Sequence, residues 1–173
     1  GQEQMQEDME MLRQILDNLV LFSFDQENLM NQFKSIEVNH NKYASYLVKQ
    51  SYLREHFSHI DDSLFALSLR QPKISERINK EISEVFFNID KSLDQFSENR
   101  MYQGVANQQY TITSANNLAD FLSDILNSMQ MQMQMQGSGT GSGGTPEQGL
   151  PDIIMSQEQL NKQMQEGTKK SNE

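Results

Sequence analysis

The sequence predicts an all-α protein, an antiparallel bundle of about four long helices followed by a flexible linker and a short amphipathic helix. Three observations support this fold class. Apolar residues recur every three or four positions through most of residues 1–136, which is the period of a helix face. Four such series have comparable lengths and are joined by short polar stretches, which favours an antiparallel bundle. Residues 137–149 are rich in Gly and Ser, a composition typical of flexible linkers.

The first predicted helix has apolar residues spaced four, three, four and three apart, at Met5, Met9, Leu12, Leu16 and Leu19. Ser23 is followed three residues later by Gln26, which is the spacing of a helix-capping box. We therefore expect this helix to be broken near Ser23, where a second half begins. The apolar face of that half consists of Leu29, Met30, Phe33 and Ile36.

Two long apolar series flank Pro72 and predict the next two helices. The first consists of Tyr43, Tyr46, Leu47, Leu53, Phe57, Ile60, Leu64 and Leu67, with Gln50 on the same face. The second consists of Ile74, Ile78, Ile82, Val85, Phe86, Ile89, Leu93 and Phe96. A proline inside a helix costs about 3 kcal/mol, so we expect Pro72 to lie at the turn of a helical hairpin. The two series nearly keep phase across Pro72, and a single kinked helix is the alternative.

A fourth helix is predicted by Val105, Ile112, Ala115, Ala119, Leu122, Leu126 and Met129. It continues into Met–Gln repeats that end at Gln136. Beyond the linker, residues 150–173 hold a polar tail and a short amphipathic pattern formed by Ile153, Ile154, Leu160 and Met164. A helix this short is not stable alone in water. It either docks on the bundle or binds another protein, and the long tether favours another protein.

Composition excludes several classes of function. The chain carries a net charge of -10, so it repels nucleic acid phosphates and anionic lipid surfaces. It has no cysteine, which excludes disulfides and cysteine-ligated zinc. No apolar run approaches the roughly 18 residues of a membrane span. Because Gly1 is not an initiator methionine, we expect the chain to be a fragment of a longer protein.

Metal binding is the alternative function, through either of two sets of residues. His56 and His59 lie one turn apart, with Asp62 near the same face, and these side chains are potential ligands of a transition metal. Met129, Met131, Met133 and Met135 carry thioethers, which are soft ligands for Cu(I). The favoured interpretation is structural in both cases: the histidines flank a buried face, and the methionines form a helix end.

No motif for catalysis or for a cofactor is present. Residues 139–144 match G-x-G-x-x-G, but a dinucleotide site needs a preceding strand and a following helix, and neither is predicted here. The chain has no cysteine nucleophile and no G-x-S-x-G elbow. We therefore expect a protein that is not an enzyme and that needs no cofactor.

Six segments, spread in order over nearly the whole chain, form a recognisable set: QMQEDMEMLRQ (4–14), LFSFDQE (21–27), DSLFALS (62–68), NNLA (116–119), LPDII (150–154) and QEQL (157–160). Together they resemble the C-terminal part of a family of large bacterial envelope proteins of unknown function (domain of unknown function family 4175).

The resemblance implies a membrane-anchored protein with a long helical region outside the bilayer. By that resemblance the fragment lies on the periplasmic side of a Gram-negative envelope, and the family provides no catalytic motif. We therefore expect a helical interaction or scaffolding module. Its partner is another protein or another part of the full-length chain.

Overall fold

A computed structural model describes residues 1–138, apart from the side chains of residues 75, 76 and 138. These residues form four α-helices and no strand: α1 (Gln2–Lys34), α2 (Tyr43–Ser68), α3 (Pro72–Ser97) and α4 (Met101–Ser138). Residues 139–173 lie outside the described residues, and they include most of the predicted linker and the whole predicted short helix. The first two residues of that predicted linker are the last two of α4.

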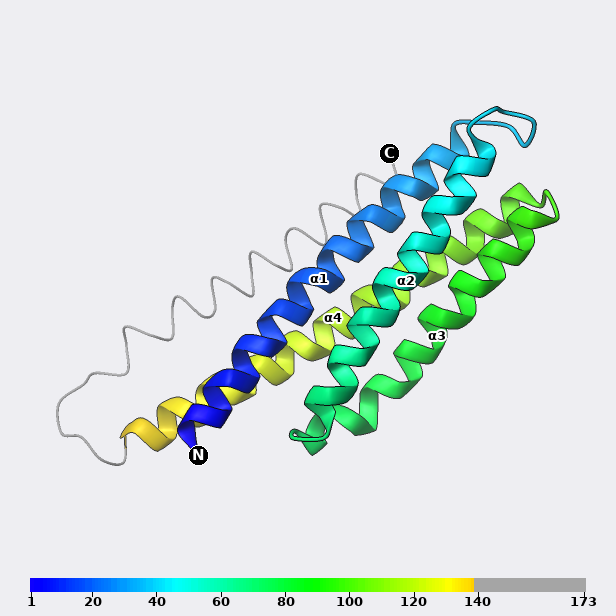
Figure 1. Cartoon of the computed structure of the whole chain (residues 1–173). Coiled ribbons are helices and arrows are strands. Elements are labelled where there is room, and N and C mark those ends of the chain that lie inside the picture. The colour runs from blue at the N-terminus through cyan, green and yellow to red at the C-terminus, as the bar shows by residue number, and fades with distance from the viewer. Residues whose placement is uncertain (139–173) are drawn as a thin grey trace.

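The four helices form an antiparallel bundle (Figure 1). Each helix packs against the next one in the chain, and α1 packs against α4, which closes the ring. The start of α1 and the end of α4 lie at the same end of the bundle as the turn between α2 and α3 (Figure 1). The predicted fold class is confirmed. It follows from helices that each have one apolar face, because antiparallel packing buries all four faces together.

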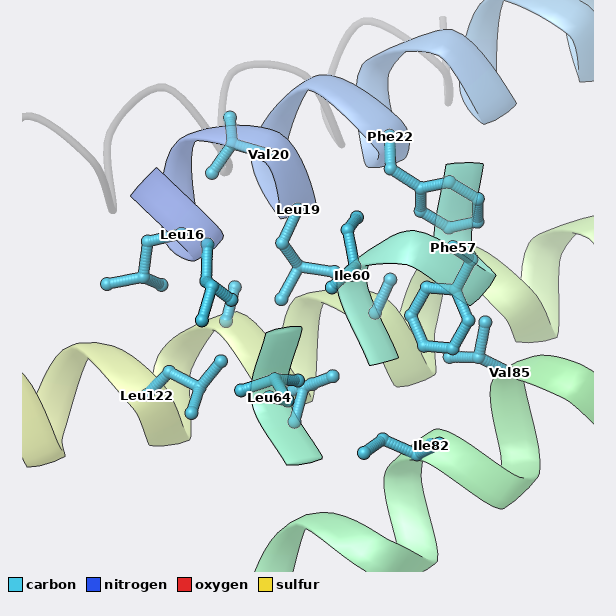
Figure 2. Packing of buried hydrophobic residues seen from close by; sticks show 14 of the residues in the cluster. Leu16, Leu19, Val20, Phe22, Phe57, Ile60, Leu64, Ile82, Val85 and Leu122 are labelled. Carbon is cyan, nitrogen blue, oxygen red and sulfur yellow. The ribbon is translucent and has the colours of Figure 1, made fainter. Parts of the chain in front are cut away.

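The apolar core runs along the inside of the ring. Figure 2 shows its middle, where side chains from all four helices meet: Leu16, Leu19 and Phe22 of α1, Phe57, Ile60 and Leu64 of α2, Ile82 and Val85 of α3, and Leu122 of α4. Nearer the turn between α1 and α2, the rings of Phe33 and Phe96 stack with their centroids 4.0 Å apart. The Tyr43 hydroxyl donates to the backbone carbonyl of Phe96, so its polar end is also satisfied inside the core.

Pro72 is the first residue of α3. At the first turn of a helix a proline loses no intrahelical hydrogen bond, and its fixed φ suits the helix. Residues 69–71 connect α2 to α3, and the Gln71 backbone N–H donates to the Leu67 carbonyl at 3.0 Å. The predicted hairpin is therefore confirmed, and the single kinked helix is not observed.

The predicted break near Ser23 is wrong. α1 is one continuous helix through Ser23, which is buried, and the Ser23 hydroxyl donates to Asn116 Oδ1 of α4 at 2.7 Å. A serine caps a helix only where the backbone leaves helical geometry. Here Leu19, Phe22 and Leu29 continue the buried face across the site, so the packing keeps the backbone helical and the hydroxyl bonds to a neighbouring helix.

Three buried glutamines lie across the core from one another. Gln26 and Gln50 exchange two amide hydrogen bonds, of 2.9 and 2.7 Å. Gln108 Nε2 donates to Gln50 Oε1 at 2.9 Å, and all three side chains are fully buried. The sequence predicts Gln50 on the buried face of its helix, and the structure identifies Gln26 and Gln108 as its hydrogen-bond partners. The cluster joins α1, α2 and α4 at one level of the bundle.

Candidate functional site

The two histidines proposed as metal ligands lie on α2, facing partly outward. His56 is half-buried, and its ring meets the edge of Phe22 with the centroids 6.1 Å apart, while His59 is exposed. Burial lowers the pKa of His56; the Asp25 carboxylate opposes this change and His59 adds to it. Within residues 1–138, no three His, Asp or Glu side chains come close enough together to hold a metal ion. In the structure, His56 packs against Phe22 of α1.

The methionine run is helical as far as α4 is described. Met129 is buried in the core and Met133 packs against it, whereas Met131 and Met135 are 50% and 75% exposed. In a helix, side chains two residues apart point in different directions. The four thioethers therefore do not converge on one point. Met129 is instead part of the apolar core.

A side groove lies between α1 and α2, with a volume of about 430 Å³. Both helices line it at helical spacing, with Asp25, Asn28, Leu29 and Gln32 on α1 and Lys49, Tyr52, Leu53 and His56 on α2. Most of these side chains are polar. The groove is the ordinary furrow between two packed helices, and Leu29 and Leu53 at its base belong to the core.

A larger groove, the end groove, lies where α1 begins and α4 ends. Its volume is about 730 Å³. It is lined by Met5 of α1, by Gln71, Pro72, Lys73 and Arg77 at the start of α3, and by Phe121, Asp124, Ile125, Ser128, Met129 and Gln132 of α4. Residues from three helices thus surround one hollow at one end of the bundle.

The lining of the end groove combines an apolar floor with a charged rim. Phe121 and Ile125 pack against the core on one side, but both are only half-buried. On the α3 side, the Arg77 guanidinium lies 5.5 Å from the centre of the Phe121 ring, and Lys73 is exposed beside it. Asp124 of α4 is exposed as well. An apolar strip with charges along its edges suits an amphipathic helix better than a small polar metabolite.

A buried carboxylate holds one wall of the end groove in place. Asp8 of α1 is only 1% exposed. Arg70 Nε donates to its Oδ1 at 2.8 Å, Gln71 Nε2 to its Oδ2 at 3.1 Å, and Gln4 Nε2 to its Oδ1 at 3.0 Å. Burial raises the pKa of Asp8, but the hydrogen bonds from Gln71, Arg70 and Gln4 outweigh it, so the pKa is lowered. The turn between α2 and α3 is thereby tied to α1.

Sequence reasoning did not find the end groove. Its floor residues Phe121 and Ile125 fall beside the predicted apolar face of the fourth helix, so that stripe is wider than one neighbouring helix requires. That extra width was the signal available in the sequence. The other walls come from residues more than 40 positions away, and no local pattern connects them.

Comparisons with protein-family models, with curated proteins and with solved structures gave no match. Among the described residues, no helix combines the length and the apolar character needed to cross a bilayer.

Proposed function

We propose that this chain is a non-enzymatic interaction module of a larger, membrane-anchored bacterial envelope protein, located on its periplasmic side. Its bundle acts as a rigid scaffold, and its end groove is the surface that binds an amphipathic helix. The observation that carries this proposal is the half-buried apolar floor of the end groove, formed by Phe121 and Ile125. Helix-in-groove binding is a recurrent mode of recognition between proteins.

The dimensions of the end groove support a helical ligand. Along α4 its lining runs from Phe121 to Gln132, which corresponds to about 17 Å of helix, or roughly three turns. A ligand helix of three to four turns presents two or three large side chains to such a strip. Lys73 and Arg77 on the α3 side favour a ligand with acidic residues on that flank.

The envelope context is supported by the resemblance of the six sequence segments to a membrane-anchored family. In that context the bundle is held outside the bilayer by parts of the longer protein. Its partner is another envelope protein or another part of the same chain.

Photo-crosslinking in the native membrane tests this function. A photoreactive residue replaces Ser128, on the lining of the end groove, in the full-length protein, and a matched version replaces Met131, which is exposed on α4 but does not line the groove. We expect one defined adduct from position 128, identified by mass spectrometry of the joined peptides. Adding Ile125→Lys should abolish this adduct. Circular dichroism checks that the variant still folds. The absence of an adduct specific to position 128 contradicts the proposal.

A further inference from the structure

We propose that the end groove is occupied by the chain's own residues 150–166, the segment that contains the predicted amphipathic helix. This inference rests on the proposed function, because it names the ligand of the same groove. Three properties of the chain lead to it: the place where α4 ends, the length of chain that follows, and the match between the segment and the groove.

The chain leaves the described bundle beside the groove. Gln132 lines the end groove and lies fewer than two helical turns before Ser138, the last residue of α4. Residues 139–149 then precede the amphipathic segment. A Gly-rich chain of that length has a root-mean-square span on the order of 18 Å. This exceeds the roughly 9 Å of helix between Gln132 and the end of α4, so the segment can turn back and reach the groove.

The segment and the groove are complementary in shape and charge. In a helix, Ile153, Leu160 and Met164 share one face. That face meets the apolar floor formed by Phe121 and Ile125, with Met5 on the same lining, and its length of about three turns equals that of the lining along α4 from Phe121 to Gln132.

The charge on one flank of the segment suits one rim of the groove. In a helix, Asp152 lies on one flank of the apolar face, where it provides a carboxylate for the rim that carries Lys73 and Arg77. Attraction between partly exposed groups of this kind is modest and selects an orientation more than it adds affinity.

Tethering favours this ligand over a free one. The segment is too short to be a stable helix alone, so it gains by burying its apolar face against a preformed surface. A Gly-rich tether as long as residues 139–149 reaches the groove of its own bundle as well as a separate protein. Linking the segment in this way raises its effective concentration at the groove to the order of millimolar. Even a weak helix–groove contact is then populated within one molecule. An external partner helix must therefore displace residues 150–166 before it binds.

Disulfide trapping in the full chain tests this inference. The chain has no cysteine, so two introduced thiols report on one pair of positions. The test pair is Ser128→Cys with Ser156→Cys, and the matched pair is Met131→Cys with Ser156→Cys. Both α4 positions are exposed and lie on neighbouring turns, but only Ser128 lines the groove. A tethered segment that does not dock reacts equally with both.

We expect the intramolecular disulfide to form at least about tenfold faster with position 128 than with position 131, because docking fixes one orientation at high effective concentration. Adding Leu160→Lys to both pairs removes that preference, whereas Gln159→Lys, with the same charge change on the next residue, retains it. Equal rates for the two pairs overturn the inference. A disulfide that forms only between chains, and faster at higher protein concentration, also overturns it and assigns the groove to a second copy. In either case, an adduct to another protein from position 128 in the native membrane leaves the proposed function intact.

Discussion

Individual polar side chains in the core decide how the helices align. Purely apolar faces slide along one another at moderate cost, but a buried amide that loses its partner costs about 1–3 kcal/mol. Gln50 bonds to both Gln26 and Gln108 only when α1, α2 and α4 hold their observed positions along the axis of the bundle. Buried polar contacts of this kind favour one register of a helical bundle.

Replacing the central glutamine tests this role. Gln50→Leu removes the three hydrogen bonds of the cluster and leaves two buried amides unpaired, so we expect a loss of about 1–3 kcal/mol for each. Urea unfolding measures it, with Gln14→Leu on the exposed face of α1 as the control. Replacing all three glutamines by leucine should recover most of the stability, because no polar group is then orphaned. A stable single variant would contradict this account.

Asp8 predicts how stability depends on pH. Its pKa in the folded chain lies below the ordinary value of 3.8, so the unfolded chain binds the proton more readily. The Asp8 contacts therefore stabilise the fold at neutral pH, and that contribution is lost as the pH falls through 3.8 toward the folded-state pKa.

The check for Asp8 is a series of urea unfolding curves between neutral and acidic pH. Asp8→Asn should be less stable than the parent at neutral pH, and the difference should shrink below pH 3.8. Asp17→Asn, at an exposed position of the same helix, is the control. A difference that stays constant with pH would show that the charge of Asp8 is not what stabilises the turn.

At the scale of the helices, α3 and α4 approach closely because one residue is glycine. Residues 98–100 connect them, and Asn99 takes a left-handed conformation with φ of 62°, which Asn tolerates better than most residues. Four residues into α4, Gly104 faces the ring of Phe96. A Cβ at that position would lie 2.4 Å from the ring, so only glycine allows this approach.

Gly104→Ala should therefore destabilise the bundle. Alanine gains about 1 kcal/mol in helix propensity, but overpacking a tight core contact costs typically about 1–3 kcal/mol, and the gap at Phe96 is too small for a methyl group. Gly137→Ala is the matched control, because a Cβ built there meets nothing within 4 Å beyond its chain neighbours and the backbone of its own helix. Thermal unfolding compares the two, and Phe96→Leu should partly rescue Gly104→Ala. A stabilised Gly104→Ala would mean that the two helices separate freely.

At the scale of the whole molecule, the closed ring of four helices buries its apolar faces within residues 1–138. A core that is complete in this way does not need the remaining chain to fold. The docking proposed for residues 150–166 accordingly concerns the surface of the bundle, at the end groove, and not its core.

Ending the chain after Ser138 tests the completeness of the core. We expect the shortened protein to unfold cooperatively, with a Tm only a few degrees lower, since one docked surface helix contributes little compared with the core. Circular dichroism melting provides the measurement, and the full chain with Leu160→Lys is the control for undocking without truncation. Loss of the cooperative transition would show that residues 139–173 belong to the core.

Within residues 1–138, the sequence by itself determined the four helices apart from the break expected near Ser23, together with their apolar faces and the turn at Pro72. These features depend on neighbours within one or two turns, so a helical period or a proline reveals them directly. The predicted faces of α2, including Gln50, and of α3 are buried except for Leu47, Phe86 and Leu93, which are partly buried and pack against the core. The tertiary structure alone decided the rest. Ser23 formed no cap because packing keeps α1 helical there, and its hydroxyl bonds to Asn116, which is 93 residues away in the sequence but lies on the neighbouring helix α4. The end groove exists only where α1, α3 and α4 meet, and no local pattern encodes which helices meet or at what height.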